Sequence, residues 1–317
     1  MKLAFLFPGQ GAQKPGMGRL IAERYPEARK VFEAADRSLG FPLSRLCWEG
    51  PAEELTRSVN AQPALLTHSV AAWTLLDGAG VKPSWVAGHS LGEYSACVAA
   101  GAIAFEEALH LVRRRGELMS RAGLERPGTM AAILGLSAGD VEACCAEAAP
   151  AGVVVAANFN SPGQVVISGE APAVERACEI ASGRGARRAI RLEVSGAFHS
   201  PLMGPAAVEL GAALERASFG DASCPIVANV TGEPVRRAAE IRGALERQLL
   251  SAVRWERSMR WLLDQGATFV ELGTGTVLRG LLRATDRQAA SWNVEDPESF
   301  QATLLGLGLA TPVGEEG

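Results

Sequence analysis

Short apolar runs alternate with longer amphipathic stretches along most of this chain. The first run, at 2–7, ends in a glycine-rich loop, which is typical of a buried strand that leads into a turn. Further strands are predicted at 81–87, 226–229 and 268–272, where apolar residues again cluster. Helical spacing of apolar residues predicts helices at 21–38, 62–77, 91–100, 106–122, 203–217, 238–250 and 255–265, and one that begins at Val277. This alternation predicts an α/β fold with a largely parallel sheet.

The middle of the chain has a different order of elements. Strands are predicted at 130–136, 153–158, 164–168 and 188–194, with helices at 139–148 and 172–182. The resulting order, βαββαβ, is that of a ferredoxin-like unit. We therefore predict a large catalytic domain of residues 1–127 plus 197–317, with a ferredoxin-like small domain, residues 128–196, inserted into it.

The pentapeptide Gly88-His89-Ser90-Leu91-Gly92 lies where a predicted strand meets a predicted helix. In this setting Gly-x-Ser-x-Gly is typical of a nucleophile elbow, the sharp turn that exposes a reactive serine in α/β-hydrolase-like domains. The glycines allow close backbone approach, and the unpaired amides that begin the helix direct its positive dipole end toward Ser90. In a chain with 35 glycines the motif could also arise by chance, but its strand-turn-helix setting favours a nucleophile.

Composition and charge exclude several classes of function. With 48% hydrophobic and 21% charged residues, the 317-residue chain has the composition of a globular enzyme. A net charge of −4 argues against nucleic-acid binding, which usually needs a basic excess. The charge-free run 148–169 holds prolines and asparagines, so it is no membrane helix, and 3–7 is too short for a signal peptide. A cytoplasmic location is expected. The cysteines lack metal-ligand spacing, so we expect reduced thiols and no metal.

A serine nucleophile needs a base, and the chain has only four histidines, His68, His89, His110 and His199. The side chain of His89 is expected to point away from Ser90 on the tight turn. His68 and His110 lie in predicted helices, where packing or surface positions are expected. His199 follows the inserted unit in a turn of small residues, where the scaffold can hold it over a site. We therefore expect His199 to be the general base, although no acidic partner for it is apparent in the local sequence.

The predicted helix at 106–122 carries a charged residue on its apolar face. Arg115 lies on the apolar stripe, whereas Arg113 and Arg114 lie beside it and can reach water. A buried guanidinium needs an anionic partner, because an unpaired buried charge is unstable. That partner is either an aspartate or glutamate of the protein or the carboxylate of a substrate, which the planar guanidinium can bind through two parallel hydrogen bonds.

Several motifs follow one another along the chain in a fixed order. They are Phe7-Pro8-Gly9-Gln10-Gly11-Ala12-Gln13, Gln62-Pro63-Ala64, Gly88-His89-Ser90-Leu91-Gly92-Glu93-Tyr94-Ser95, Arg115-Gly116, Asn158-Phe159-Asn160-Ser161-Pro162-Gly163-Gln164, Phe198-His199-Ser200 and Glu271-Leu272-Gly273. Together they resemble the motifs of the malonyl-CoA:acyl carrier protein transacylases. The resemblance extends over nearly the whole chain, and it is far more specific than an isolated Gly-x-Ser-x-Gly.

The resemblance implies a catalytic role for several matching residues. Ser90 would be the acylated nucleophile and His199 its base. A main-chain carbonyl near Gln248 would orient His199 in place of an aspartate, which agrees with the missing acid. The backbone amides of Gln10 and Leu91 would form the oxyanion hole, which binds the negative oxygen of the tetrahedral intermediate.

The resemblance also implies which residues bind the substrate. Arg115 would anchor the malonyl carboxylate, and this would make acetyl-CoA a poor substrate, because a site built for a charged group rejects an analogue that lacks it. Gln62 and Asn160 would be further site residues. Phe198 stands where malonyl-selective relatives carry a bulky residue, so its ring would exclude the α-methyl group of methylmalonyl-CoA.

The reaction implied is a transfer in two half-reactions that supplies extender units for fatty acid synthesis. Malonyl-CoA would acylate Ser90 first, and the phosphopantetheine thiol of an acyl carrier protein would then take the malonyl group from the serine. No bound cofactor is expected. A monomer is expected. Because carrier proteins are acidic, surface arginines could form a docking rim, although they could equally be ordinary solvated side chains. These arginines are Arg184, Arg187, Arg188, Arg191, Arg236 and Arg237.

Three other functions are compatible with parts of this pattern. A discrete acyltransferase that acts in trans in a polyketide pathway would use the same chemistry with a different carrier protein. A serine acyl-hydrolase would release the acyl group to water, which Arg115 and the missing acid disfavour. An inactive scaffold domain conflicts with the presence of Ser90, His199 and Arg115 together.

Overall fold

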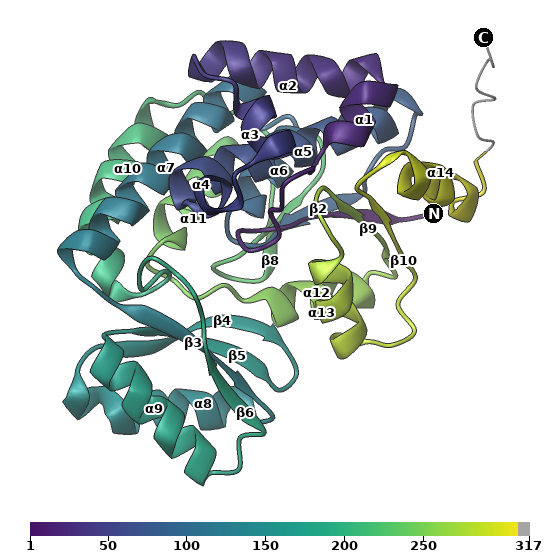
Figure 1. Ribbon diagram of the computed structural model, residues 1–317. Helices are drawn as coiled ribbons and strands as arrows, with labels where there is room; N and C mark the ends of the chain where they lie inside the picture. Colours follow the sequence, from purple (N-terminus) through teal and green to yellow (C-terminus); the bar gives the residue numbers. More distant parts are fainter. Residues whose placement is uncertain (310–317) are drawn as a thin grey trace.

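The computed structural model describes residues 1–309, in which two sheets each have their own helices (Figure 1). The larger sheet has the strand order β10-β9-β1-β2-β7-β8. All neighbouring strands in it are parallel except β7 and β8, so the predicted α/β fold class is confirmed. Its strands are β1 (Leu3–Phe7), β2 (Trp85–Gly88), β7 (Ile226–Ala228), β8 (Glu233–Val235), β9 (Thr268–Leu272) and β10 (Ser291–Val294).

Helices cover both faces of the larger sheet, which explains why β1 is apolar at every position. Leu3, Phe5 and Phe7 pack into one core, with α2, α5, α6 and α7. Ala4 and Leu6 point the other way, into a core with α12 and α13. The helices of this part are α1 (Arg19–Arg24), α2 (Pro26–Leu39), α3 (Leu43–Glu49), α4 (Ala52–Thr56), α5 (Ser58–Gly78), α6 (Gly92–Ala99), α7 (Phe105–Glu125), α10 (Gly204–Arg216), α11 (Ala238–Gln248), α12 (Trp255–Asp264), α13 (Val277–Thr285) and α14 (Pro297–Gly306).

The smaller sheet is antiparallel, with the strand order β4-β5-β3-β6. Its elements follow one another as β3, α8, β4, β5, α9 and β6, which is the predicted βαββαβ order. Helices α8 and α9 share a third core with this sheet (Figure 1, bottom). The bounds are β3 (Thr129–Leu134), α8 (Ala138–Ala148), β4 (Val154–Ser161), β5 (Gln164–Gly169), α9 (Ala171–Gly183) and β6 (Arg188–Arg191).

Several element boundaries differ from the sequence prediction. The strand predicted at 81–87 covers only Trp85–Gly88, because Pro83 holds the preceding residues in a loop. The helix predicted at 21–38 is two helices, and Pro26 begins the second one at the position where proline is favoured. The elements α3, α4, β8 and β10 were not predicted, because at seven residues or fewer they are too short to show a clear periodicity, and α14 was missed as well. Within residues 1–309, no helix is long and apolar enough to span a bilayer.

Gly116 lets the long helices α5 and α7 approach each other closely. A Cβ atom at this position would lie 2.5 Å from the carbonyl oxygen of Ser58 and 2.8 Å from the Cα of Val59. The backbones of the two helices therefore meet where Arg115 enters the interior, and a larger residue would separate them.

We predict that Gly116→Ala lowers the free energy of unfolding by about 1–3 kcal/mol, because its methyl group overlaps the α5 backbone. Gly211→Ala is the matched control: Gly211 is also inside a helix, α10, but a Cβ there meets no atom within 4 Å. The free energy of unfolding of this control should instead rise by up to about 1 kcal/mol, because alanine has a higher helix propensity than glycine. Urea unfolding of the three proteins measures both values, and an unchanged stability of Gly116→Ala would contradict the packing argument.

Candidate active site

The turn between β2 and α6 holds Ser90 in a left-handed backbone conformation, with φ of 51°. The two flanking glycines are needed for close approach. A Cβ on Gly88 would lie 1.9 Å from the backbone of Gly92, and a Cβ on Gly92 would lie 2.0 Å from the carbonyl oxygen of Phe7. The turn therefore packs tightly on itself and on β1, and it projects the Ser90 side chain away from the sheet as a nucleophile elbow does.

Asn229, which directly follows β7, braces this turn. Its Oδ1 accepts a hydrogen bond from the amide of Ser90 at 2.7 Å, and its Nδ2 donates to the carbonyl of Gly88 at 2.6 Å. Asn229 was not among the predicted site residues. Its place after the strand next to β2, at the carboxyl edge of a parallel sheet, was a signal that could have indicated it.

His199 contacts the Ser90 hydroxyl directly. The distance from Ser90 Oγ to His199 Nε2 is 2.7 Å, and His199 Nδ1 lies 3.0 Å from the carbonyl oxygen of Gln248 and 3.2 Å from that of Ser251. Nδ1 therefore carries the proton and Nε2 is free to accept one from Ser90. His199 also has a positive φ, 57°, and within residues 1–309 it shares this property only with Ser90 among residues other than glycine.

The imidazole of His199 is held in its neutral form. Burial, together with the nearby positive charge of Arg115, lowers its pKa to about 3, although the two carbonyl acceptors oppose the shift. A base with so low a pKa is unprotonated throughout the physiological range.

Arg115 is buried and reaches the nucleophile from α7. Its guanidinium donates to Gln62 Oε1 at 2.9 Å, to Ser90 Oγ at 3.0 Å and to Gln248 Oε1 at 3.0 Å. No carboxylate within residues 1–309 lies at ion-pairing distance from it, so the internal ion pair considered from sequence is absent there. Burial lowers the pKa of Arg115, and the electrostatic influence of Tyr94 and Glu93, neither of which forms an ion pair with it, only partly opposes this shift.

Glu93, the next functional residue that sequence reasoning missed, is buried behind Gln248. Gln248 Nε2 donates to Glu93 Oε2 at 2.6 Å and to the carbonyl of Ser90 at 2.9 Å, and the amide of Asn229 donates to Glu93 Oε1 at 3.3 Å. Burial raises the pKa of Glu93 to about 7, against the effect of these donors and of Arg115. Gln248 thus contacts Ser90, Arg115, Glu93 and His199.

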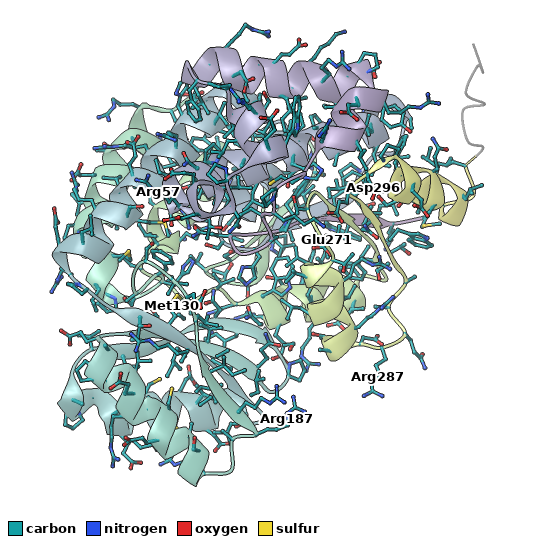
Figure 2. The ribbon with its side chains drawn as sticks, in the orientation of Figure 1. Arg57, Met130, Arg187, Glu271, Arg287 and Asp296 are labelled. Atoms are coloured by element: carbon teal, nitrogen blue, oxygen red, sulfur yellow. The ribbon has the colours of Figure 1, made fainter. Side chains whose placement is uncertain are left out.

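The side chains of Ser90, His199 and Arg115 line one cavity of about 570 Å³ between the two sheets. Met130, which comes from β3 and is labelled in Figure 2, lines it from the side of the smaller sheet. The cavity also receives Gln10, Asn160 and Phe198, all of them predicted site residues. The structure thus brings together residues from both ends and from the middle of the chain.

The remaining predicted residues lie in or next to this cavity. Gln10 donates its side-chain amide to Ser58 Oγ at 3.0 Å, while its backbone amide and that of Leu91 donate to no protein group in the described part of the chain. Asn160 Oδ1 lies 2.8 Å from His89 Nε2. His89 is therefore directed at Asn160 and not at Ser90, as expected. Gln62 is fully buried beside Arg115.

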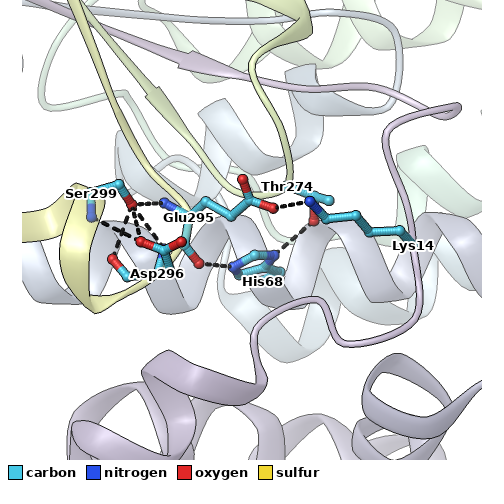
Figure 3. Close-up of polar contacts among 6 residues, drawn as sticks. All are labelled: Lys14, His68, Thr274, Glu295, Asp296 and Ser299. Atoms are coloured by element: carbon cyan, nitrogen blue, oxygen red, sulfur yellow. Dashed lines mark hydrogen bonds and ion pairs between the residues drawn. The ribbon is translucent and has the colours of Figure 1, made fainter.

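The other two histidines are far from this chemistry. His68 is buried on α5, with Nδ1 2.8 Å from Thr274 Oγ1 and Nε2 3.0 Å from the carbonyl oxygen of Glu295, and burial lowers its pKa to about 4 (Figure 3). The Glu295 carboxylate also pairs with Lys14 at 2.7 Å, which fastens the N-terminal glycine-rich loop to the C-terminal part. His110 is exposed and contacts Ser38. No cluster of histidine, cysteine or carboxylate side chains within residues 1–309 could hold a metal ion.

Comparison with known proteins gives consistent matches over nearly the whole chain. A family model described as the acyl transferase domain matches residues 4–306. The malonyl CoA-acyl carrier protein transacylase of Bacillus subtilis (strain 168) is 47% identical over 308 residues, which are 96% of this chain and 97% of that protein. The solved structure of the malonyl CoA-acyl carrier protein transacylase from Coxiella burnetii has a TM-score of 0.94 and 39% identity, and the match covers 97% of this chain and 98% of that one.

A further solved structure contains a protein partner. It is a type II polyketide acyl carrier protein in complex with its malonyl-transacylase. The match has a TM-score of 0.93 and 43% identity, and it covers 96% of this chain and 99% of the matched chain.

We predict that His199 makes the protein less stable in acid. Because its pKa in the folded state, about 3, lies below the ordinary value of 6.5, the unfolded chain binds the proton first as the pH falls. The contribution of His199 to the free energy of unfolding therefore decreases from about pH 6.5 downward, whereas the buried carboxyls of Glu93 and Glu271, whose pKa values are raised to about 7, act in the opposite direction. His199→Gln should reduce the slope of this decrease between pH 4 and 6 by about one proton, or about 1.4 kcal/mol per pH unit.

Urea unfolding at several pH values measures these slopes for the wild type and the variant. His110→Gln, which removes an exposed histidine, is the matched control. Equal slopes for the wild type and His199→Gln would contradict the assignment of a low pKa to His199.

Proposed function

The chain belongs to the acyl transferase family, and on this premise we propose that it transfers malonyl groups from malonyl-CoA to the phosphopantetheine thiol of an acyl carrier protein. One observation carries the proposal. Ser90 Oγ lies 2.7 Å from a neutral histidine and 3.0 Å from a guanidinium that has no carboxylate partner in the described residues, and all three groups line one cavity. The site can therefore combine a nucleophile with a receptor for a negatively charged acyl chain.

In the first half-reaction, Ser90 attacks the thioester carbonyl of malonyl-CoA. His199 Nε2 takes the hydroxyl proton as the new C–O bond forms, and the imidazolium then gives this proton to the departing coenzyme A sulfur as the C–S bond breaks. The low pKa of His199 favours the second proton transfer. The backbone amides of Gln10 and Leu91, which have no acceptor within residues 1–309, supply the donors of the oxyanion hole, each of which typically contributes about 10²- to 10³-fold to the rate.

In the second half-reaction, the carrier protein's thiol replaces coenzyme A in the same cavity. His199 takes the thiol proton, the sulfur attacks the malonyl-serine ester, and the proton returns to Ser90 Oγ as the C–O bond breaks. The carbonyls of Gln248 and Ser251 hold the imidazole in the required tautomer through both steps, so no aspartate is needed.

Arg115 selects for malonyl groups in this proposal. Its hydrogen-bond partners are neutral amides and a hydroxyl, so its charge remains available to the substrate carboxylate. Phe198 is buried at the cavity wall, where its ring limits the space for an α-substituent. Asn160, which also lines the cavity, fixes His89.

We also propose the biological setting and the division of the chain. We assign the chain to fatty acid synthesis. The similarity to the malonyl-transacylase of a type II polyketide system favours the alternative, a role in a polyketide pathway. Measuring transfer to a panel of fatty acid and polyketide carrier proteins distinguishes the two roles. Six free thiols agree with a reducing cytoplasm, where we expect a monomer. The two sheets support a division into residues 1–127 plus 197–317 and residues 128–196.

We predict that malonyl-CoA labels Ser90 covalently. Intact-mass measurement should show one malonyl adduct on the wild type and none on Ser90→Ala. Arg115→Ala should lower kcat/KM for acylation by malonyl-CoA by about 10²-fold or more, with a smaller effect on acetyl-CoA, because only malonyl-CoA offers a carboxylate. Without carrier protein the adduct should persist, whereas rapid loss to water would identify a hydrolase and failure to label Ser90 would identify an inactive scaffold.

We predict that Arg187 and Arg188 contribute to binding of the carrier protein. Both side chains are exposed: Arg188 begins β6, the edge strand of the smaller sheet, and Arg187, labelled in Figure 2, directly precedes it. Of the proposed docking rim, Arg184, Arg191 and Arg237 pair with glutamates and Arg236 donates to two carbonyls. Arg187 and Arg188 have no ion-pair partner in the described residues and remain available to an acidic partner.

Replacing both arginines by alanine should raise the KM for carrier protein about tenfold and leave acylation by malonyl-CoA unchanged. Arg45→Ala with Arg260→Ala, two exposed arginines on α3 and α12 that pair with glutamates, is the matched control. Equal KM values for carrier protein in both double variants would remove the docking rim from the proposal.

A further inference from the structure

A buried carboxylate lies one side chain away from the guanidinium of Arg115. Arg115 donates to Gln248 Oε1 at 3.0 Å, and the other end of the same amide, Nε2, donates to Glu93 Oε2 at 2.6 Å. Arg115, Gln248 and Glu93 are all at most 2% exposed. The amide of Gln248 therefore separates two groups that would otherwise attract each other strongly in an interior shielded from water.

The orientation of this amide is fixed by its surroundings. Arg115 has only donors, so it requires the oxygen of Gln248, while Glu93 and the carbonyl of Ser90 are acceptors and require the nitrogen. Reversing the amide would place two donors face to face and two acceptors face to face. The Glu93 carboxylate, which also accepts a hydrogen bond from the main-chain N–H of Asn229, thus keeps the Gln248 oxygen directed at Arg115.

A direct ion pair between Glu93 and Arg115 would cancel the charge that the substrate has to meet. A guanidinium already paired with a carboxylate offers a second carboxylate much less attraction, and the two anions would repel each other. The structure avoids this pair with a neutral side chain that satisfies both partners.

We propose that the Gln248 side chain is a specificity-determining spacer, which prevents Glu93 from pairing with Arg115 and so keeps the guanidinium available to an acyl group that ends in a carboxylate. This inference rests on the proposed function. It assigns to the side chain of Gln248 a task separate from that of its main-chain carbonyl, which holds His199. Glu93 is a positioning residue, because it orients the side-chain amide of Gln248. It is also the group that would compete with the substrate carboxylate for Arg115 if this amide were absent.

The test compares acylation of Ser90 by malonyl-CoA and acetyl-CoA in the full-length protein, followed by intact mass in quenched reactions. The readout is the ratio of the two kcat/KM values, which cancels losses shared by both substrates. Gln248→Met keeps the volume and the main-chain carbonyl but removes the spacer's polar groups, so the malonyl-to-acetyl ratio should fall about tenfold or more, mainly through the KM for malonyl-CoA. Gln301→Met, on α14 far along the chain, is the matched control and should leave the ratio unchanged.

A second variant separates competition by Glu93 from general damage. Adding Glu93→Gln to Gln248→Met removes the competing charge and should restore most of the malonyl-to-acetyl ratio. If the double variant is no more selective than Gln248→Met, or if Gln248→Met keeps the wild-type ratio, the spacer proposal is overturned. If Gln248→Met does not fold, Gln248→Glu replaces it: a carboxylate then contacts Arg115 directly, and an unchanged ratio would again overturn the proposal.

The same experiment distinguishes failure of the spacer from failure of the proposed function. A wild-type protein that malonyl-CoA does not label contradicts the function itself. A wild type that is labelled with a clear malonyl preference, together with a Gln248→Met variant of equal preference, contradicts only the spacer.

Discussion

The positive charge of Arg115, buried without a carboxylate beside it in the described residues, is the interaction on which the rest of the site depends. A guanidinium in the interior needs acceptors for its hydrogens, and here two glutamine oxygens and the Ser90 hydroxyl accept from its two terminal nitrogens, while its buried Nε has no partner within residues 1–309. Gly116 allows α7 to lie close enough to α5 for Gln62 to be one of these acceptors. The same charge helps to keep the base neutral. Receptor, nucleophile and base are therefore one electrostatic unit.

Much of the fold could be predicted from the sequence, because its strongest patterns are local. The apolar run of β1, the small residues of the elbow and the order of elements in the smaller sheet each follow from periodicity over a few residues. Arg115 could be placed inside because its neighbours on the helix are apolar. The short elements β8 and β10 could not be predicted in the same way, because only neighbouring strands make them strands.

The missing parts of the site are those that join distant segments. Asn229 braces Ser90 across 139 residues, and Glu93 meets Gln248 across 155. The place of Asn229 after a strand marks the carboxyl edge of the sheet but not the residue that it contacts, and Glu93 has no local signal at all, since a glutamate near a helix start is an ordinary surface residue in most sequences. Nor could spacing decide between a protein carboxylate and a substrate carboxylate for Arg115. That choice depends on which side chains converge in three dimensions.

The left-handed conformation shared by Ser90 and His199 has a consequence for evolution in the laboratory. A residue with a Cβ atom is strained at positive φ, and glycine is not, so replacing either residue by glycine would relieve strain in the very positions that perform catalysis. Selection on this scaffold has to couple survival to turnover, because robustness and chemistry compete at the same two backbone positions.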